Sequence, residues 1–324
     1  MANFSSAYAL PPLPDYELHP LPSLIPNLPD KILVLILPVI AYWSLSLVFH
    51  YIDVNDFFEK YRLHTPAEVL KRNRVSINEV IREVLIQHFV QTLTGWLFTL
   101  IEPIDMFGSQ EYDIHVWAQR IRMSQRMIPK VLSIVGIDAL ALSSVLFPSR
   151  PMLAGLLAGG YYPNLKTIST VQGHTGVVPA YAAWEMVYAK SIYWVIVPAM
   201  QLLLAVLIID TWQYFLHRAM HMNQYLYRTL HSRHHRLYVP YAFGALYNHP
   251  VEGFMLDTVG AGLAYKFAGL TTRQGMVLFT FATLKTVDDH CGYALPWDPL
   301  QFLFPNNAPY HDVHHQSWGI KVGF

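Results

Sequence analysis

Long apolar runs alternate with polar segments along this chain, and the first run predicts a membrane-spanning helix. The run Ile32–Ile52 holds 21 residues without a charged side chain, and a bilayer-spanning helix needs about 20. The segment that follows is basic, with Lys60, Arg62, Lys71, Arg72 and Arg74. Because basic loops tend to stay in the cytosol, we expect the chain from Asp53 onward to lie there and the preceding tail to lie outside.

The next apolar runs give a weaker signal. Leu85–Ile101 contains two glutamines and a histidine, and a second basic segment follows it. A crossing at this point would place that basic segment outside the cytosol, so we expect Leu85–Ile101 to form an interfacial or re-entrant helix. We then expect Val131–Phe147 to cross outward and Ile192–Asp210 to cross back. The Gly-, Pro- and Tyr-rich connection Pro148–Lys190 would join these two crossings.

Two shorter apolar runs, Gly253–Gly269 and Gly275–Val287, predict a hairpin that enters the membrane from the cytosol and returns to it. This path keeps all the histidine-rich segments on one aqueous side. The sequence therefore predicts an all-α membrane protein with several spans and a cytosol-facing helical cap that carries a histidine-rich di-metal site. Its expected parts are a Pro-rich tail (1–31), membrane spans and connections (32–190) and a histidine-rich region (191–324).

Composition supports a membrane-embedded chain. Hydrophobic residues make up 53% and charged residues 14% of the sequence, whereas soluble domains carry about 25% charged residues. The net charge is zero, which gives no indication of a nucleic-acid partner. The single cysteine, Cys291, excludes an intrachain disulfide and a C-x-x-C site. No cleavable signal peptide is expected in the first 30 residues.

Histidine is concentrated in three short motifs. They are HxxxH at His217 and His221, HxxHH at His231, His234 and His235, and HxxHH again at His311, His314 and His315. Residues three and four apart lie on one face of a helix, so each motif is predicted to point its imidazoles in one direction. Asp210 lies seven residues before His217 and on the same predicted face. It would orient a ligand by accepting the second ring N–H.

Eight motif histidines are more than one metal ion takes. A structural zinc has four ligands and a catalytic zinc has three plus water, so the motifs predict two ions. The HExxH motif of metalloproteases is absent. The paired Glu-x-x-His of carboxylate di-iron proteins is also absent. An all-histidine, two-metal site beside membrane spans fits oxygen activation best among these classes.

The order of the three motifs on membrane helices resembles the fatty acid hydroxylase superfamily, which includes sterol C4-methyl oxidases, sterol desaturases and sphingolipid hydroxylases. The stretches His231–Gly260 and Thr286–His315 are similar to those of the sphinganine C4-hydroxylases. The resemblance extends from about residue 192 to residue 318. It implies two further metal ligands, His290 in the segment DDHCGY and His249 in the segment NHPVE.

This resemblance implies that two iron ions use O2 to hydroxylate C4 of sphinganine or dihydroceramide, giving phytosphingosine or its ceramide. Zinc can displace iron from such a site during purification. Electrons would come from cytochrome b5 and its reductase acting in trans, because no His-Pro-Gly-Gly haem motif is present. The implied location is the endoplasmic reticulum membrane, in a multi-pass arrangement with the active site facing the cytosol.

Other residues gain candidate roles from their positions. An apolar slot for the lipid would be lined by Tyr214, Phe215, Tyr241 and Phe243. An acidic electron donor would dock on Arg218, Arg228, Arg233 and Arg236. Asp257 lies inside an apolar run, and an intramembrane ionisable group is a functional candidate.

Two alternatives remain open on the sequence alone. A sterol C4-methyl oxidase or sterol desaturase would have the same metal motifs. A membrane metal transporter would place its ligands near the middle of the crossing helices, whereas these motifs follow helix ends. The sequence ends at Phe324, nine residues after His315, where superfamily members continue with an aromatic-rich stretch. We therefore expect any closure of the substrate site by such a stretch to be missing.

Overall fold

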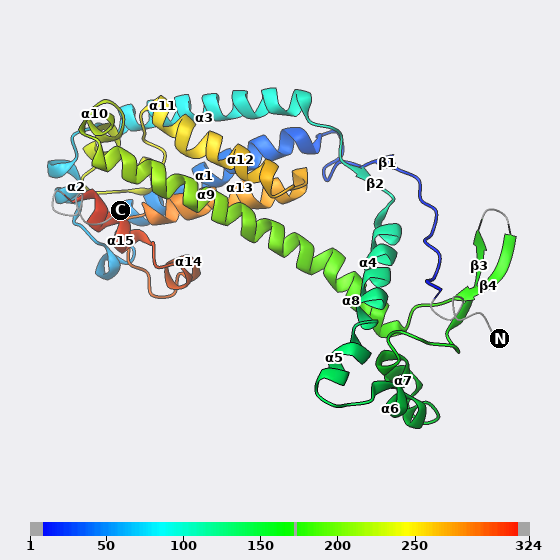
Figure 1. Ribbon diagram of the computed structural model, residues 1–324. Helices are drawn as coiled ribbons and strands as arrows, with labels where there is room; N and C mark the ends of the chain where they lie inside the picture. Colours follow the sequence, from blue (N-terminus) through cyan, green and yellow to red (C-terminus); the bar gives the residue numbers. More distant parts are fainter. Residues whose placement is uncertain (1–8, 172–173, 317–324) are drawn as a thin grey trace. The chain divides into compact units, whose positions relative to one another are not determined.

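The computed structural model describes residues 9–171 and 174–316 (Figure 1). Residues 317–324, on which the expectation about the C-terminal stretch rests, lie outside that range. The described chain is mostly helical, as predicted. It divides into two compact units, Met1–Leu21 with Ile104–Met200 and Pro22–Pro103 with Gln201–Phe324. We call these the small unit and the histidine unit.

The small unit combines short helices with two small antiparallel sheets. Its elements are β1 (His19–Pro20) paired with β2 (Met106–Phe107), α4 (Gln110–Gln125), α5 (Ile128–Ile134), α6 (Ala139–Leu146), α7 (Pro151–Leu157), β3 (Lys166–Val171) paired with β4 (His174–Pro179), α8 (Ala183–Ser191) and the π-helical turn η3 (Ile192–Ile196). The predicted outward crossing at Val131–Phe147 is wrong as a single helix. The chain breaks between α5 and α6, and the segments on either side of the break are bent by 113°.

A buried ion pair in the small unit removes Arg122 from the surface charge that the topology prediction used. Arg122 Nε donates to Glu185 Oε1 at 2.5 Å, and both side chains are almost fully buried. Gln125 Nε2 donates to the same oxygen at 2.6 Å, which joins α4 to α8. Arg122 is thus a packed, paired group. It does not act as the solvated surface charge that sorting of loops across a membrane depends on.

The histidine unit is a helical bundle with a cap of short helices. Its elements are α1 (Asp30–Val54), η2 (Glu59–Tyr61), α2 (Pro66–Arg72), α3 (Ile77–Ile101), most of α9 (Val197–Met222), α10 (Gln224–Thr229), η4 (His231–Arg236), η5 (Ala242–Gly244), α11 (Pro250–Gly253), the π-helical turn η6 (Phe254–Val259), α12 (Gly260–Phe267), α13 (Thr272–Asp289), α14 (Pro299–Leu303) and α15 (Ala308–His315). Figure 1 shows α1, α3, α12 and α13 side by side.

Helix caps begin the bundle helices where the sequence signals them. Ser76 caps α3 by accepting from the backbone N–H of Glu79. Thr271 and Gln274 form a capping box at the start of α13. Such side chains satisfy backbone donors that have no partner within the helix, which fixes the first turn.

Three helices among the described residues are long and apolar enough to cross a membrane. They are α1, α3 and the 40-residue run Ala183–Met222, which comprises α8, η3 and α9. The predictions at Ile32–Ile52 and Ile192–Asp210 are therefore confirmed as candidate spans. The segment Leu85–Ile101 is not a re-entrant loop, since α3 is one continuous helix of 25 residues and a third candidate span. Its expected interfacial position stays a prediction.

The histidine unit has two distinct ends. Polar contacts join helix ends at the end remote from the histidines: Arg273 with Asp30, Lys266 with Glu102, and Gln201 with Gly269. The chain leaves the unit at Pro103 and re-enters it at Gln201, both at this remote end. The predicted hairpin is present, because α12 and α13 meet there and lead back to the histidine end.

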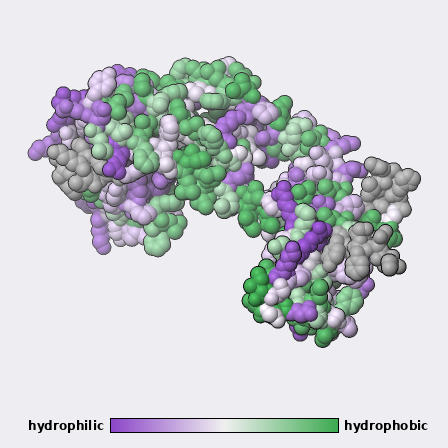
Figure 2. Space-filling model, viewed as in Figure 1, coloured by the Kyte–Doolittle hydropathy of each residue, from purple (hydrophilic) through white to green (hydrophobic). Residues whose placement is uncertain are grey.

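Apolar side chains cover the outside of the bundle. Exposed examples include Ile40 and Leu47 on α1, Phe89 and Leu97 on α3, and Leu203 on α9. Figure 2 shows hydrophobic surface over the bundle and hydrophilic surface over the end of this unit that carries the histidines. A continuous apolar exterior with a polar end is what a bilayer requires of a spanning bundle.

Polar contacts, together with a shared hydrophobic core, fasten the cap to the bundle. Tyr293 donates to Asp53 Oδ1 at 2.6 Å, and the backbone N–H of Leu63 donates to Gly292 O at 2.9 Å. His64 Nε2 lies 2.8 Å from Asp312 Oδ1 on α15. These contacts hold the segments that carry His290 and His311 against the ends of α1 and α2.

Candidate metal centre and lipid cavity

Nine histidines meet at one end of the histidine unit and form two groups that could each hold a metal ion. Within each group the ligand atoms lie within 4.8 Å of one another. The first group is His217, His221, His231, His235 and His314, and the second is His234, His290, His311 and His315.

In the first group the ring nitrogens face one another at short range. The Nε2 atom of His231 lies 3.0 Å from that of His217, 2.9 Å from that of His221 and 3.0 Å from that of His235. His217 and His221 are themselves 3.1 Å apart at Nε2. A neutral imidazole has one donor and one acceptor nitrogen, so three mutually close Nε2 atoms cannot satisfy one another by hydrogen bonds. A cation between them would satisfy all of them.

The second group has the same form and adjoins the first. His311 Nε2 lies 3.0 Å from the Nε2 atoms of both His290 and His315. The ring centroids of His235 and His315, one from each group, are 4.9 Å apart. The two groups therefore form one continuous cluster of imidazoles.

The prediction that each motif points its imidazoles in one direction is correct for HxxxH and wrong in detail for the two HxxHH motifs. His231 and His235 enter the first group, whereas His234 enters the second. His311 and His315 enter the second group, whereas His314 enters the first. Adjacent residues differ by about 100° around a helix, so a consecutive pair of histidines cannot share a direction. Each HxxHH motif thus supplies both groups.

Four imidazoles are oriented by hydrogen bonds at the opposite ring nitrogen, Nδ1. The acceptors are Glu252 Oε1 for His231 (2.5 Å), Tyr247 O for His234 (3.1 Å), Thr286 O for His290 (2.8 Å) and Leu237 O for His315 (2.6 Å). An Nδ1–H that donates to such an acceptor leaves Nε2 with its lone pair toward the cluster. The protein thereby presets the tautomer that a metal ion needs.

Burial keeps these imidazoles neutral. His231 and His315 are 1% and 0% exposed. Desolvation lowers the pKa of His234, and it lowers the pKa of His235 and His315 well below the ordinary value. Burial also lowers the pKa of His290, to about 3. Since only the neutral ring can bind a metal through its lone pair, the fold favours the ligand form at neutral pH.

Two residues expected in or beside the cluster lie outside it. His249 belongs to neither group; its Nδ1 accepts from the backbone N–H of Val251 and caps α11. Asp210 is exposed on α9 and makes no contact with His217 in the described structure. Seven residues of helix separate the two by about 10 Å, which is too far for a hydrogen bond.

Glu252 fills the role that Asp210 was expected to have. It lies three residues after His249, in the segment NHPVE, and its carboxylate is fully buried against His231. The sequence did offer Glu252 as a candidate, because it is a carboxylate within one helical turn of His249. Which histidine Glu252 contacts depends on how α11 packs against η4, and residue spacing does not predict that packing.

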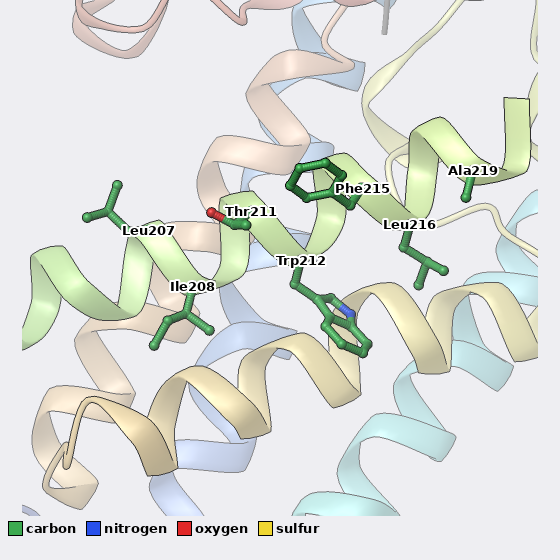
Figure 3. Close-up of a pocket in the computed structure, with 7 residues that line it drawn as sticks. All are labelled: Leu207, Ile208, Thr211, Trp212, Phe215, Leu216 and Ala219. Atoms are coloured by element: carbon green, nitrogen blue, oxygen red, sulfur yellow. The ribbon is translucent and has the colours of Figure 1, made fainter. Parts of the chain in front are cut away.

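An interior cavity runs through the bundle of the histidine unit. It is lined by residues of α1, α3, α9, η6, α12 and α13, among them Leu35, His88, Gln213, Asp257 and Thr286. A second, shallow groove lies on the outside of α9, where Phe215 is exposed and Trp212 lies against the neighbouring helix (Figure 3). Trp212 Nε1 donates to Met255 O at 2.8 Å. This groove is apolar outer surface, whereas the interior cavity lies inside the bundle and includes Gln213, one helical turn before His217.

Comparisons with known proteins agree with this geometry. The family model described as fatty acid hydroxylase matches residues 202–324. A sphingolipid C4-hydroxylase of Saccharomyces cerevisiae is 44% identical over 96% of this chain and 72% of its own length. One of Schizosaccharomyces pombe is 41% identical over 90% of this chain and 82% of its own length. The chain belongs to the sphingolipid C4-hydroxylase family. It is a monooxygenase by this membership, as the histidine motifs predicted.

The chain is also similar to a protein whose name gives another activity. A protein of Oryza sativa subsp. indica named very-long-chain aldehyde decarbonylase is 35% identical over 89% of this chain and 80% of its own length. No solved structure matches the chain.

In this member of the hydroxylase family, other predicted roles change. Arg233 and Arg236 are paired with Glu83 (3.0 Å) and Glu79 (2.6 Å) on α3. They attach η4 to the bundle, and docking of an acidic electron donor on the arginines stays a prediction. The predicted aromatic slot is wrong. Tyr214 and Phe215 lie exposed on the outer side of α9, Phe243 is buried in the core and Tyr241 packs against that core, while the interior cavity is lined by other residues.

Proposed function

We propose that this chain hydroxylates C4 of a sphingoid lipid, sphinganine or dihydroceramide, with O2 at a centre of two histidine-ligated iron ions. The observation that carries the proposal is the pairing of a five-histidine group with an adjoining four-histidine group near one end of an interior cavity with an apolar middle. The similarity of the chain to sphingolipid C4-hydroxylases over almost its whole length supports the choice of substrate class.

The spacing of the nitrogens fits the proposed ions. Ligand nitrogens at right angles around an ion, each about 2.1 Å from it, lie about 3.0 Å from one another, whereas tetrahedral ligands lie about 3.4 Å apart. Most of the neighbouring Nε2 pairs are 2.9 to 3.1 Å apart. Five ligands in one group also exceed the four of a tetrahedral zinc site. The donor set therefore suits iron of higher coordination number.

The reaction balances with a donor of two electrons. One oxygen atom of O2 enters the C4–H bond as a hydroxyl group, and the other leaves as water after taking up two electrons and two protons. When bound, the iron ions would supply O2 activation, and cytochrome b5 with its reductase would supply the electrons in trans. The protein would act in the endoplasmic reticulum membrane with the histidine end facing the cytosol, which places the cluster on the side of that donor.

The contribution of the chain itself is orientation and exclusion of water. Glu252 and the carbonyls of Tyr247, Thr286 and Leu237 hold four imidazoles in place. The buried histidines of η4 and α15 leave little room for solvent. The apolar part of the cavity would hold the lipid chain and fix which carbon faces the cluster.

Expression in yeast that lacks its own C4-hydroxylase tests the proposal. Lipid mass spectrometry should show phytosphingosine restored by the wild-type chain and absent with His234→Ala, provided both proteins insert into the membrane. Altered sterols without phytosphingosine would favour the sterol enzymes of the superfamily. Loss of long-chain aldehydes without phytosphingosine would favour the activity named for the rice relative.

A further inference from the structure

The interior cavity ends close to the histidine cluster. Gln213 lines the cavity and lies one helical turn before His217 on α9. Thr286 also lines it, and its carbonyl accepts from His290 at 2.8 Å. One turn of helix is about 5.4 Å. A group bound at this end of the cavity is therefore within a few ångströms of the reacting centre.

The cavity changes in character along its length. The end near the histidines is lined by polar side chains, including those of His88, Gln91, Gln213, Asp257 and Thr258. The middle is lined by apolar groups such as Leu35, Pro38, Phe279 and Ala282. Lys31 and Lys266, both bound to Glu102, stand at the remote end. The cavity is thus polar at both ends and apolar between them, and its apolar middle suits the tail of a lipid whose polar head lies toward the histidines.

Asp257 is the carboxyl group at the polar end. Its carboxylate accepts from Gln213 Nε2 at 3.2 Å and from Gln87 Nε2 at 3.5 Å. Among the described residues, no lysine, arginine or histidine forms an ion pair with it. Asp257 lies on the π-helical turn η6, a distortion that is often found at functional sites. A carboxylate inside a membrane bundle calls for a cation, and here a ligand could supply one.

Further polar atoms beside Asp257 lack partners. Within the described part of the chain, His88 Nε2, Thr258 Oγ1 and Gln87 Oε1 are buried without a hydrogen-bond partner. His88 is only 7% exposed and lines the cavity. Buried polar atoms are rarely left unsatisfied, and several around one carboxylate indicate a site for a polar ligand.

We propose that Asp257 binds the protonated amine of a free long-chain base, and that His88 and Thr258, which line the same cavity, bind its hydroxyl groups. This inference rests on the proposed function and deepens it, because it selects the free base over the N-acylated lipid. A primary amine is protonated at neutral pH, whereas an amide carries no charge to pair with Asp257. The amine of such a base is thus both the counter-ion of Asp257 and the group that sets substrate choice.

The dimensions agree with this orientation. Three bonds separate the amine nitrogen from C4, which is at most about 4 Å, so an amine at Asp257 keeps C4 at the polar end of the cavity. From Thr286 to Thr272 the cavity follows α13 for fourteen residues, or about 21 Å. The fourteen carbons beyond C4 in an eighteen-carbon base extend roughly 18 Å.

A binding experiment tests the subsite without turnover. Octadecylamine should raise the melting temperature of the purified full-length protein, and octadecanol at the same concentration should not. Asp257→Asn keeps the shape of the side chain and should abolish the shift with octadecylamine. Asp210→Asn is the matched control, because it makes the same change at an exposed site in the membrane region, and it should keep the shift. Equal shifts for the amine and the alcohol in the wild type would overturn the proposal.

A turnover experiment tests substrate choice. The ratio of kcat/KM for sphinganine to that for N-acetylsphinganine should fall at least tenfold in Asp257→Asn, with metal content unchanged. An equal loss on both lipids would contradict the proposal and make Asp257 a structural group. Amine-selective binding without C4 product from any lipid would support the subsite and contradict the proposed function, so the two failures are distinguishable.

Discussion

The Oε1 atom of Glu252 lies 2.5 Å from Nδ1 of His231, and both side chains are almost completely buried. His231 is also the histidine whose Nε2 is close to those of His217, His221 and His235. A single carboxylate on α11 thus orients the imidazole at the centre of the first group. This contact links the position of α11 to the geometry of the cluster.

Replacing this carboxylate should weaken metal binding more than it weakens folding. In Glu252→Gln we expect iron affinity to fall about 10- to 100-fold, because the amide no longer fixes the tautomer of His231. Iron per protein after dialysis against a graded chelator measures the change. Asp210→Asn is the control and should bind iron like the wild type. Loss in Asp210→Asn and retention in Glu252→Gln would reverse the assignment made here.

Neighbouring histidines should affect different ions. His234→Ala removes a ligand from the four-histidine group, and His235→Ala removes one from the five-histidine group. We expect each variant to lose roughly 100-fold or more in turnover and to retain iron mainly in the intact group. Metal analysis with product mass spectrometry on both variants gives the answer. Two full ions and normal turnover in either variant would contradict the division into two groups.

His249 should act on stability and not on metal content. Its ring caps α11 by accepting from the N–H of Val251 at 3.2 Å. Loss of such a cap costs about 0.5–2 kcal/mol. We expect His249→Ala to lower the melting temperature of the metal-free protein, and His249→Asn, which can still cap, to restore most of it. Both should bind as much iron as the wild type; a clear drop in iron with His249→Asn would show that this residue is a ligand.

Whether α3 crosses the bilayer can be tested by cysteine labelling of the protein in sealed vesicles. If α3 crosses the bilayer, single cysteines in place of Arg74 and Ile104 should react with an impermeant maleimide from opposite sides. The background is Cys291→Ser, because Cys291 is the one native cysteine. A re-entrant helix would expose both positions on the same side, and that result would restore the interpretation drawn from the basic segment.

The sequence predicted the fold class, two of the candidate spans and the hairpin, because long apolar runs leave few alternatives in a membrane. It did not predict the length and continuity of α3, whose polar residues Gln87 and His88 turn inward. Histidine spacing identified the cluster. Spacing could not predict how each HxxHH motif divides between two groups, nor that Glu252 is the partner of His231, because both depend on how separate elements pack.

Substrate recognition was the least predictable part of the site. Aromatic residues near the motifs suggested a slot, yet Phe215 faces outward, while Gln213, two residues earlier, faces the cavity. A difference of about 200° around the helix separates the two side chains. Which face of α9 turns inward is settled by packing against η6, and single-sequence patterning does not specify it.

The most direct test of C4 hydroxylation at the two-ion site is incubation of the iron-loaded, full-length protein with sphinganine, reduced cytochrome b5 and ¹⁸O2. Mass spectrometry of the product should show a 4-hydroxy base with one ¹⁸O atom at C4, formed by the wild type and not by His234→Ala or His235→Ala. Product with oxygen from water, oxidation at another carbon, or equal product from these variants would contradict the account.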